Sequence, residues 1–194
     1  MRFYAKTNDF DGDIEVMSQT GSIGNETISA WAVGSVAGYT LSGIAWKPRL
    51  GVQFDGASGN SDPRGHVLQT FNPLFPNGLY FTLAGYTTYV NLMHIKQSLT
   101  LQPTSSVKIR LAVAEQWRET TADAVYVIPN IPVPGTAGKP GLYTGTYEQA
   151  DLQWTINPHL SFAVEAVYFD VSDVIKTAGG HNSTYLGVQL AYAW

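Results

Sequence analysis

The feature that most constrains the fold of this chain is an alternation of apolar and polar residues that recurs along most of its length. In residues 107–118, VKIRLAVAEQWR, large apolar side chains take one parity, and Lys, Arg and Gln fill most of the other. Residues 150–156, 160–168 and 183–194 repeat the pattern. A period of two is typical of β-strands whose two faces meet different environments. The sequence therefore predicts an all-β fold.

The connections between the predicted strands alternate in length. Weaker alternation elsewhere brings the expected number of strands to about eight, with residues 2–7 as a possible ninth. The short connections are residues 42–48, 102–106 and 156–159, and the longer ones are residues 57–90, 119–143 and 170–182. An antiparallel meander places alternate connections at opposite ends of the sheet. The pattern therefore predicts an up-and-down transmembrane β-barrel, or the C-terminal part of a larger one, with short periplasmic turns and long extracellular loops.

Alternation alone does not decide which face meets water, because a soluble barrel buries its apolar parity. Three features favour an apolar face toward lipid. Charged residues make up 13% of the chain, about half of the ~25% in an average soluble protein. They keep almost entirely to one parity, with exceptions at Glu115 and Asp170 near the loop ends of strands. Aromatic residues cluster toward strand ends, at Trp31, Trp117, Tyr168, Tyr192 and Trp194.

Composition excludes several other classes of protein. The apolar runs are far shorter than the ~20 residues of a membrane-spanning helix. The chain has 0 Cys, which removes disulfides and thiolate metal sites. A net charge of -4 argues against a nucleic-acid partner. No basic segment followed by an apolar one opens the chain, so either the protein stays inside the cell or an export signal lay upstream.

The polar parity predicts a basic wall inside the barrel. Its members are Arg49, Lys96, Lys108, Arg110 and Arg118. Acidic residues fall elsewhere on the same parity, at Asp55, Asp151, Glu165 and Glu15. A basic wall near the periplasmic mouth would attract a polyanion, and acids would keep the polyanion from binding too tightly. The alternative is that these charges pair with one another and prefer no solute.

The sequence predicts no catalytic site, no cofactor and no metal site. The four histidines, His66, His94, His159 and His181, are scattered, and surface or turn positions are expected for them. Asp9, Asp11 and Asp13 have calcium-loop spacing, but Ile14 occupies the glycine position, so a polar periplasmic turn is expected there. No nucleophile, base and acid are set at a catalytic spacing. An enzyme is therefore not expected.

Residues 71–76, FNPLFP, interrupt the longest loop with two prolines that flank apolar residues. Proline fixes its own backbone angle and stiffens such a segment. We expect this loop to be partly buried, as a plug in the lumen or a lid over it.

Three stretches carry a family resemblance: residues 68–104, which contain TFNPLFP, residues 115–141, which contain WRETTADAVY, and residues 151–169. They resemble the C-terminal half of the alginate-export family of bacterial outer-membrane β-barrels, and residues 42–63 look like the same family. The resemblance implies a gated channel that passes an acidic exopolysaccharide, alginate in the name-giving members, through an arginine-rich lumen. The positions of this chain that match that basic lumen in residue type are the five residues of the basic wall.

Members of that family are longer, begin with an export signal and close about twice as many strands. Residues 1–194 are therefore expected to be a single domain that corresponds to the C-terminal part of the family domain. Trp194, on the apolar parity, resembles the terminal aromatic signal that the barrel-assembly machinery recognises. The expected location is the bacterial outer membrane, with its lipids and an anionic polysaccharide or other anionic solute as partners.

Two other interpretations remain open at this point. One is a soluble β-barrel or sandwich that binds a ligand, with the apolar parity inside. The other is a truncated barrel fragment with no transport activity of its own.

Overall fold

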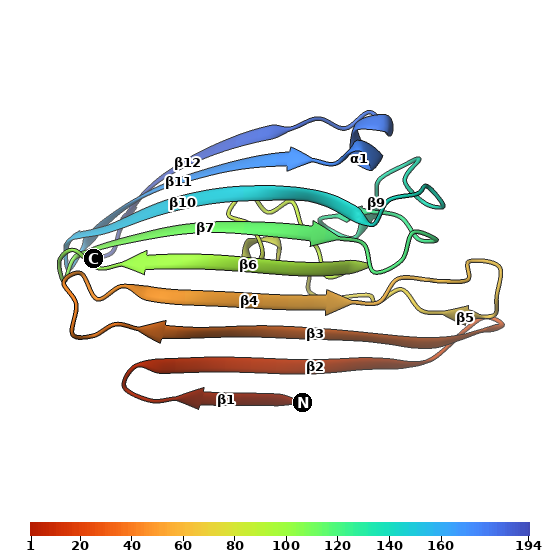
Figure 1. The fold of residues 1–194 in the computed structure, drawn as a ribbon, viewed down its shortest axis with the longest axis horizontal. Helices are drawn as coiled ribbons and strands as arrows, with labels where there is room; N and C mark the ends of the chain where they lie inside the picture. Colours follow the sequence, from red (N-terminus) through yellow and green to blue (C-terminus); the bar gives the residue numbers. More distant parts are fainter.

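A single curved antiparallel sheet dominates the computed structural model, which describes residues 1–194 (Figure 1). Its strands are β1 (Arg2–Lys6), β2 (Phe10–Ile23), β3 (Glu26–Thr40), β4 (Arg49–Ala57), β5 (Val67–Leu68), β6 (Leu92–Leu101), β7 (Val107–Trp117), β10 (Tyr143–Asn157), β11 (Leu160–Val171) and β12 (Ser183–Tyr192). The remaining elements are the hairpin β8 (Tyr126–Val127) and β9 (Ile131–Pro132), a 3-10 turn (Gly78–Tyr80) and α1 (Asp173–Thr177). Neither helical segment has the length and apolar character needed to cross a bilayer.

The long strands follow one another in chain order across the sheet. The order is β1-β2-β3-β4-β6-β7-β10-β11-β12, and the short β5 pairs with β3 in parallel. The predicted meander of about eight or nine strands is thus present. The two edge strands, β1 and β12, are not paired with each other. The sheet is therefore open, and the predicted closed barrel is not formed by these strands alone.

The connections lie at two distinct ends, as Figure 1 shows. The turns after β1, β3, β6 and β10 lie at one end, which we call the short-turn end. The connections after β4, β7 and β11 lie at the opposite, long-loop end. The predicted separation of short turns from long loops is confirmed. One tight hairpin also occurs at the long-loop end, between β2 and β3, where Gly24 has the left-handed φ of 58° that such a turn favours.

The two faces of the sheet differ as the alternation predicts. Apolar side chains at odd-numbered positions of β3 and at even-numbered positions of β4 point outward. Each of the following is exposed by 41% or more: Trp31, Tyr39, Leu50 and Phe54. The opposite parity faces the concave side, where the long connections lie. Soluble proteins rarely expose a continuous apolar surface of this kind.

Three carboxylates interrupt the outward face. Glu115 and Asp170 lie there, near the loop ends of β7 and β11, as predicted. Glu148 is a third, between Val113 and Tyr168 of the neighbouring strands, and its parity was not recognised from the sequence.

Candidate functional site

The concave side of the sheet is filled partly by its own connections. Part of the connection of residues 58–91, between β4 and β6, passes behind the strands in Figure 1 and lies against the inward face, whereas β5 within it pairs with β3 at the long-loop end. Residues 58–91 are tied to the other long connection, residues 118–142. The Asn91 side-chain amide donates to the carbonyl oxygens of Thr120 and Ala124, at 3.0 and 2.8 Å. The Asp123 carboxylate accepts a hydrogen bond from the Thr70 hydroxyl, at 2.6 Å, and another from the backbone N–H of Asn60, at 2.9 Å. The two loops therefore form one packed unit.

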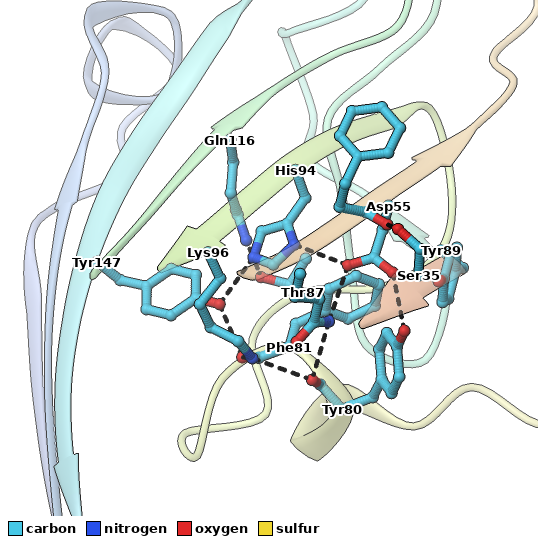
Figure 2. Close-up of polar contacts among 12 residues, drawn as sticks. Ser35, Asp55, Tyr80, Phe81, Thr87, Tyr89, His94, Lys96, Gln116 and Tyr147 are labelled. Carbon is cyan, nitrogen blue, oxygen red and sulfur yellow. Dashed lines mark hydrogen bonds and ion pairs between the residues drawn. The ribbon is translucent and has the colours of Figure 1, made fainter. Parts of the chain in front are cut away.

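Within this unit, residues 78–89 enter the concave side and contact four strands; we call them the plug segment. The centre of this contact is Asp55 of β4, which is 0% exposed. Figure 2 shows its carboxylate between the phenols of Tyr80 and Tyr89, which donate to Oδ1 at 2.9 and 2.6 Å. Gln53 Nε2 and His94 Nδ1 each lie 2.8 Å from Oδ2. All the acceptor capacity of the buried carboxylate is used, which such a charge requires.

Burial, together with the Asp55 charge, raises the pKa of both phenols, Tyr80 and Tyr89. Both hydroxyls are therefore protonated at neutral pH and remain donors to the carboxylate.

The backbone of the plug segment is held from three further strands. Lys96 Nζ of β6 donates to the carbonyl oxygen of Phe81 at 2.8 Å. The Tyr147 hydroxyl of β10 donates to the same oxygen at 2.7 Å. Gln149 Oε1 accepts from the Leu83 amide at 3.2 Å, and Gln116 Nε2 of β7 donates to the Thr87 hydroxyl at 2.7 Å. These contacts fix the plug segment to the inward face.

Between the plug segment and the short-turn end lies a cavity of about 550 Å³. Its charged lining residues are Lys47, Arg49, Lys96, Lys108, Arg110 and Asp11. Four of the five residues predicted for the basic wall are therefore brought together, and Lys47 of the turn before β4 joins them. We call this space the basic cavity.

Small residues make room for the basic cavity. Gly51, Ser98 and Ala112 are register partners across β4, β6 and β7 and leave little side-chain volume between the cations above and below them. Gly38 of β3 has a related role, because a Cβ there would overlap the guanidinium of Arg49. Glycine permits this close approach of a side chain to the backbone.

Two of the four predicted cations have carboxylate partners. Arg49 binds Asp11 of β2 through two hydrogen bonds, at 2.9 and 2.5 Å. Arg110 Nε lies 2.7 Å from Asp151 Oδ2 of β10. The Asp11 partner corrects the prediction that residues 9–13 form a polar turn: Asp9 lies in the turn after β1, but Asp11 belongs to β2 and faces inward. Lys96 and Lys108 have no carboxylate within ion-pair distance.

Arg118, the fifth predicted member, does not join the basic cavity. It follows β7 at the long-loop end and is 1% exposed. Its guanidinium donates to the carbonyl oxygens of Thr136 at 2.7 Å, Lys139 at 2.8 Å and Asp123 at 3.2 Å, and also to Gly141. The alternation continued to this residue in the sequence, but the chain turns into the loop there. Arg118 thus organises residues 118–142 instead of facing the lumen.

The histidines follow the expectation at three positions and depart from it at one. His66, His159 and His181 are exposed. His94 of β6 is buried, with its Nε2 2.8 Å from the Tyr147 hydroxyl. The alternation of residues 95–101, extended by one residue, puts His94 on the inward parity. No other feature of the sequence indicates that this histidine is buried.

The FNPLFP stretch is only partly buried. Phe71 is 5% exposed, against Ala30, Ala32 and Ala57, but Leu74 and Phe75 are exposed. It borders a second cavity of about 1050 Å³ against β1, β2 and β3, where Arg2 pairs with Asp13. That cavity has no excess of cations. The part of the loop that enters deepest is the plug segment, which follows FNPLFP.

Comparison with known proteins adds one assignment to this geometry. A search of curated proteins finds no match for the chain. A family model described as alginate export matches residues 1–189, which is nearly the whole chain. On that match, and in agreement with the resemblance in residues 68–104, 115–141 and 151–169, the chain belongs to the alginate export family.

Proposed function

We propose that this chain forms the basic wall and the plug of an outer-membrane channel that exports or conducts an anionic polysaccharide such as alginate, or other anions. The role is transport and not catalysis. Membership of the alginate export family supports a role in polysaccharide export. The charges that line the basic cavity support the part of the proposal that the solute is anionic.

The observation that carries the proposal is the charge balance of the basic cavity. Its lining includes five Lys or Arg side chains and a single carboxylate, Asp11. A concave, low-dielectric space of one sign attracts solutes of the opposite sign. Lys47, Lys96 and Lys108 have no carboxylate partner and are the charges that remain for a solute. The pairs at Arg49 and Arg110 lower the net charge, which keeps a polyanion from binding too tightly to leave.

The outward face supports a lipid environment. The soluble alternative required the apolar parity inside, whereas the apolar parity here is exposed, as at Leu111, Val188 and Leu190. Aromatic residues occur at both ends of this face: Trp31 and Tyr168 toward the long-loop end, and Tyr39 and Tyr192 toward the short-turn end. Such girdles are typical of membrane barrels.

In lipid the free backbone groups of an open edge need partners. β1 and β12 are the first and ninth strands of an alternating path and run in the same direction. An odd number of additional strands would therefore close the barrel with antiparallel pairing throughout. We propose that the channel includes such strands.

The test is the current through the assembled protein in a planar bilayer, with a soluble oligouronate added on the short-turn side. We expect the oligouronate to reduce the chloride current reversibly, and a neutral oligosaccharide of the same length to have no effect. Equal block by both sugars, or by neither, would contradict an anion-binding lumen.

A further inference from the structure

We propose that Lys96 is the residue through which an anionic solute releases the plug, so that Lys96 makes opening of the channel specific for anions. This inference rests on the proposed function, because it requires anions to enter the basic cavity. It assigns to one side chain both the recognition of solute charge and the attachment of the plug segment.

Lys96 lies at the boundary between the basic cavity and the plug segment. Its ammonium donates to the carbonyl oxygen of Phe81 at 2.8 Å and to that of Tyr80 at 3.3 Å. The same side chain lines the basic cavity. In Figure 2 it points from β6 toward the backbone at Phe81, beside Tyr147. The hydrogen bonds of Arg49 and Arg110 go to Asp11 and Asp151 and not to the plug segment.

The sheet register places Lys96 farther from the short-turn end than Arg49, Lys108 and Arg110. Lys96 is register partner of Ala114 and lies one inward row beyond the row of Gly51, Ser98 and Ala112. The next inward row toward the short turns holds Arg49 and Arg110, which flank Thr100. Cations therefore occur on both sides of a row of small residues. A linear anion that enters past Lys108 and Arg110 meets Lys96 last, at the underside of the plug segment.

The partners of Lys96 make it easier for a solute to recruit than Arg49 or Arg110. Arg49 and Arg110 already bind carboxylates, and a solute would have to displace a charged partner from them. Lys96 binds only neutral carbonyl oxygens. A carboxylate carries a full negative charge, so it attracts an ammonium more strongly than a neutral carbonyl oxygen does. A solute carboxylate can therefore take the ammonium from the carbonyl oxygens, whereas a neutral sugar has no such advantage.

Withdrawal of Lys96 would weaken one end of the plug segment. The carbonyl oxygen of Phe81 would keep the Tyr147 hydroxyl, and Asp55 would keep both tyrosine phenols. The amides of Phe81 and Thr82 bond to the carbonyl oxygen of Gly78, and the Leu83 amide bonds to Gln149. These three amides report on local opening, because they exchange with solvent only when the segment moves.

The experiment measures hydrogen exchange of residues 79–85 in the assembled protein in lipid nanodiscs, with and without an oligouronate. Wild type is compared with Lys96→Met, which keeps an unbranched stem but has no donor. Lys139→Met is the matched control, because Lys139 is an exposed lysine of the other long connection and does not line the basic cavity. Lys96→Arg retains charge and donors, and it shows whether a variant at this position folds and responds.

We expect the oligouronate to speed exchange at Phe81, Thr82 and Leu83 by about tenfold in wild type, the effect of losing one charge-assisted hydrogen bond. Lys96→Met should exchange faster without any solute and should not respond further. Lys139→Met should keep wild-type basal exchange and the wild-type response, and Lys96→Arg should respond. Wild-type basal exchange in Lys96→Met, or an undiminished response in that variant, would overturn the proposal.

Direct binding separates this inference from the proposed function. One outcome is that the oligouronate binds wild type, as measured by calorimetry in the same nanodiscs, without any change in exchange. That result would contradict release of the plug segment through Lys96 and would leave the proposed anion channel intact. If the oligouronate does not bind at all, the proposed function fails and solute-driven release fails with it.

Discussion

Arg49 of β4 binds Asp11 of β2 across the intervening strand β3, with its guanidinium over Gly38. The two residues are not on neighbouring strands, and the contact is possible only because the strand between them has no side chain at that point. The pair sets the charge of the basic cavity, since Asp11 is its only acidic lining residue.

Removing the Asp11 charge should make the lumen more selective for anions. In Asp11→Asn the guanidinium of Arg49 loses its charged partner and contributes fully to the local potential. A change of roughly 0.5–1 kcal/mol in a solvated lumen corresponds to about a two- to fivefold rise in the anion-to-cation permeability ratio. The reversal potential in a salt gradient measures this ratio.

Glu15→Gln is the control for Asp11→Asn. It neutralises an acid on the same strand but outside the basic cavity, so it should change the ratio less. An unchanged or lower ratio in Asp11→Asn would count against the charge balance described here.

Tyr89→Phe should loosen the plug segment without changing the charge of the lumen. The variant deletes the 2.6 Å hydrogen bond to Asp55 and leaves a buried carboxylate with three donors. A hydrogen bond to a charged group contributes about 1.5–3 kcal/mol. Single-channel recordings should show longer open times at unchanged selectivity. Tyr126→Phe, which deletes a phenol that donates to Asp123 in the other loop, is the control. The assignment of Asp55 as an anchor fails if both variants open the channel equally.

Arg118→Met should destabilise residues 118–142 and leave anion selectivity unchanged. The guanidinium donates to several carbonyl oxygens of that loop. Each buried carbonyl left without a donor costs about 1–3 kcal/mol. Hydrogen exchange and limited proteolysis should both find the loop more accessible. If this variant loses anion selectivity while the loop stays intact, Arg118 contributes to the basic wall and its assignment to the loop is wrong.

The alternation in the sequence predicts the strands, their two faces and the positions of most cations of the basic cavity, because these depend on local periodicity alone. β7 was expected at residues 107–118 and occupies Val107–Trp117. The placement of Arg49, Lys96, Lys108 and Arg110 on one face follows from strand parity and neighbouring register.

The rest depends on contacts between segments distant in the chain, which periodicity does not encode. The sequence predicts a polar turn at Asp11, because the calcium-loop spacing of Asp9, Asp11 and Asp13 lacks its glycine, yet pairing with β3 places Asp11 in a strand. Arg118 continued the period of β7 but serves the loop that follows. His94 and Asp55 meet only because β4 and β6 are adjacent in the sheet.

The proposed lipid environment of the outward face predicts different effects of arginine at two neighbouring positions of β11. Val164 faces outward beside Leu152 and Val188, whereas Ala163 faces inward beside Gln153 and Gln189. Val164→Arg should destabilise the protein in lipid vesicles by about 2–4 kcal/mol. Ala163→Arg should cost much less, since its charge meets the aqueous lumen. Urea unfolding in vesicles measures both. A larger loss for Ala163→Arg would reverse the assignment of the two faces.

Selection of anions by the basic cavity is measured by the reversal potential of the assembled protein in a planar bilayer under a potassium chloride gradient. Wild type should prefer chloride over potassium. Simultaneous replacement of Arg49, Lys108 and Arg110 by Gln should abolish or invert that preference. If the triple variant keeps the wild-type preference, the basic cavity does not set selectivity, and the proposed function is contradicted.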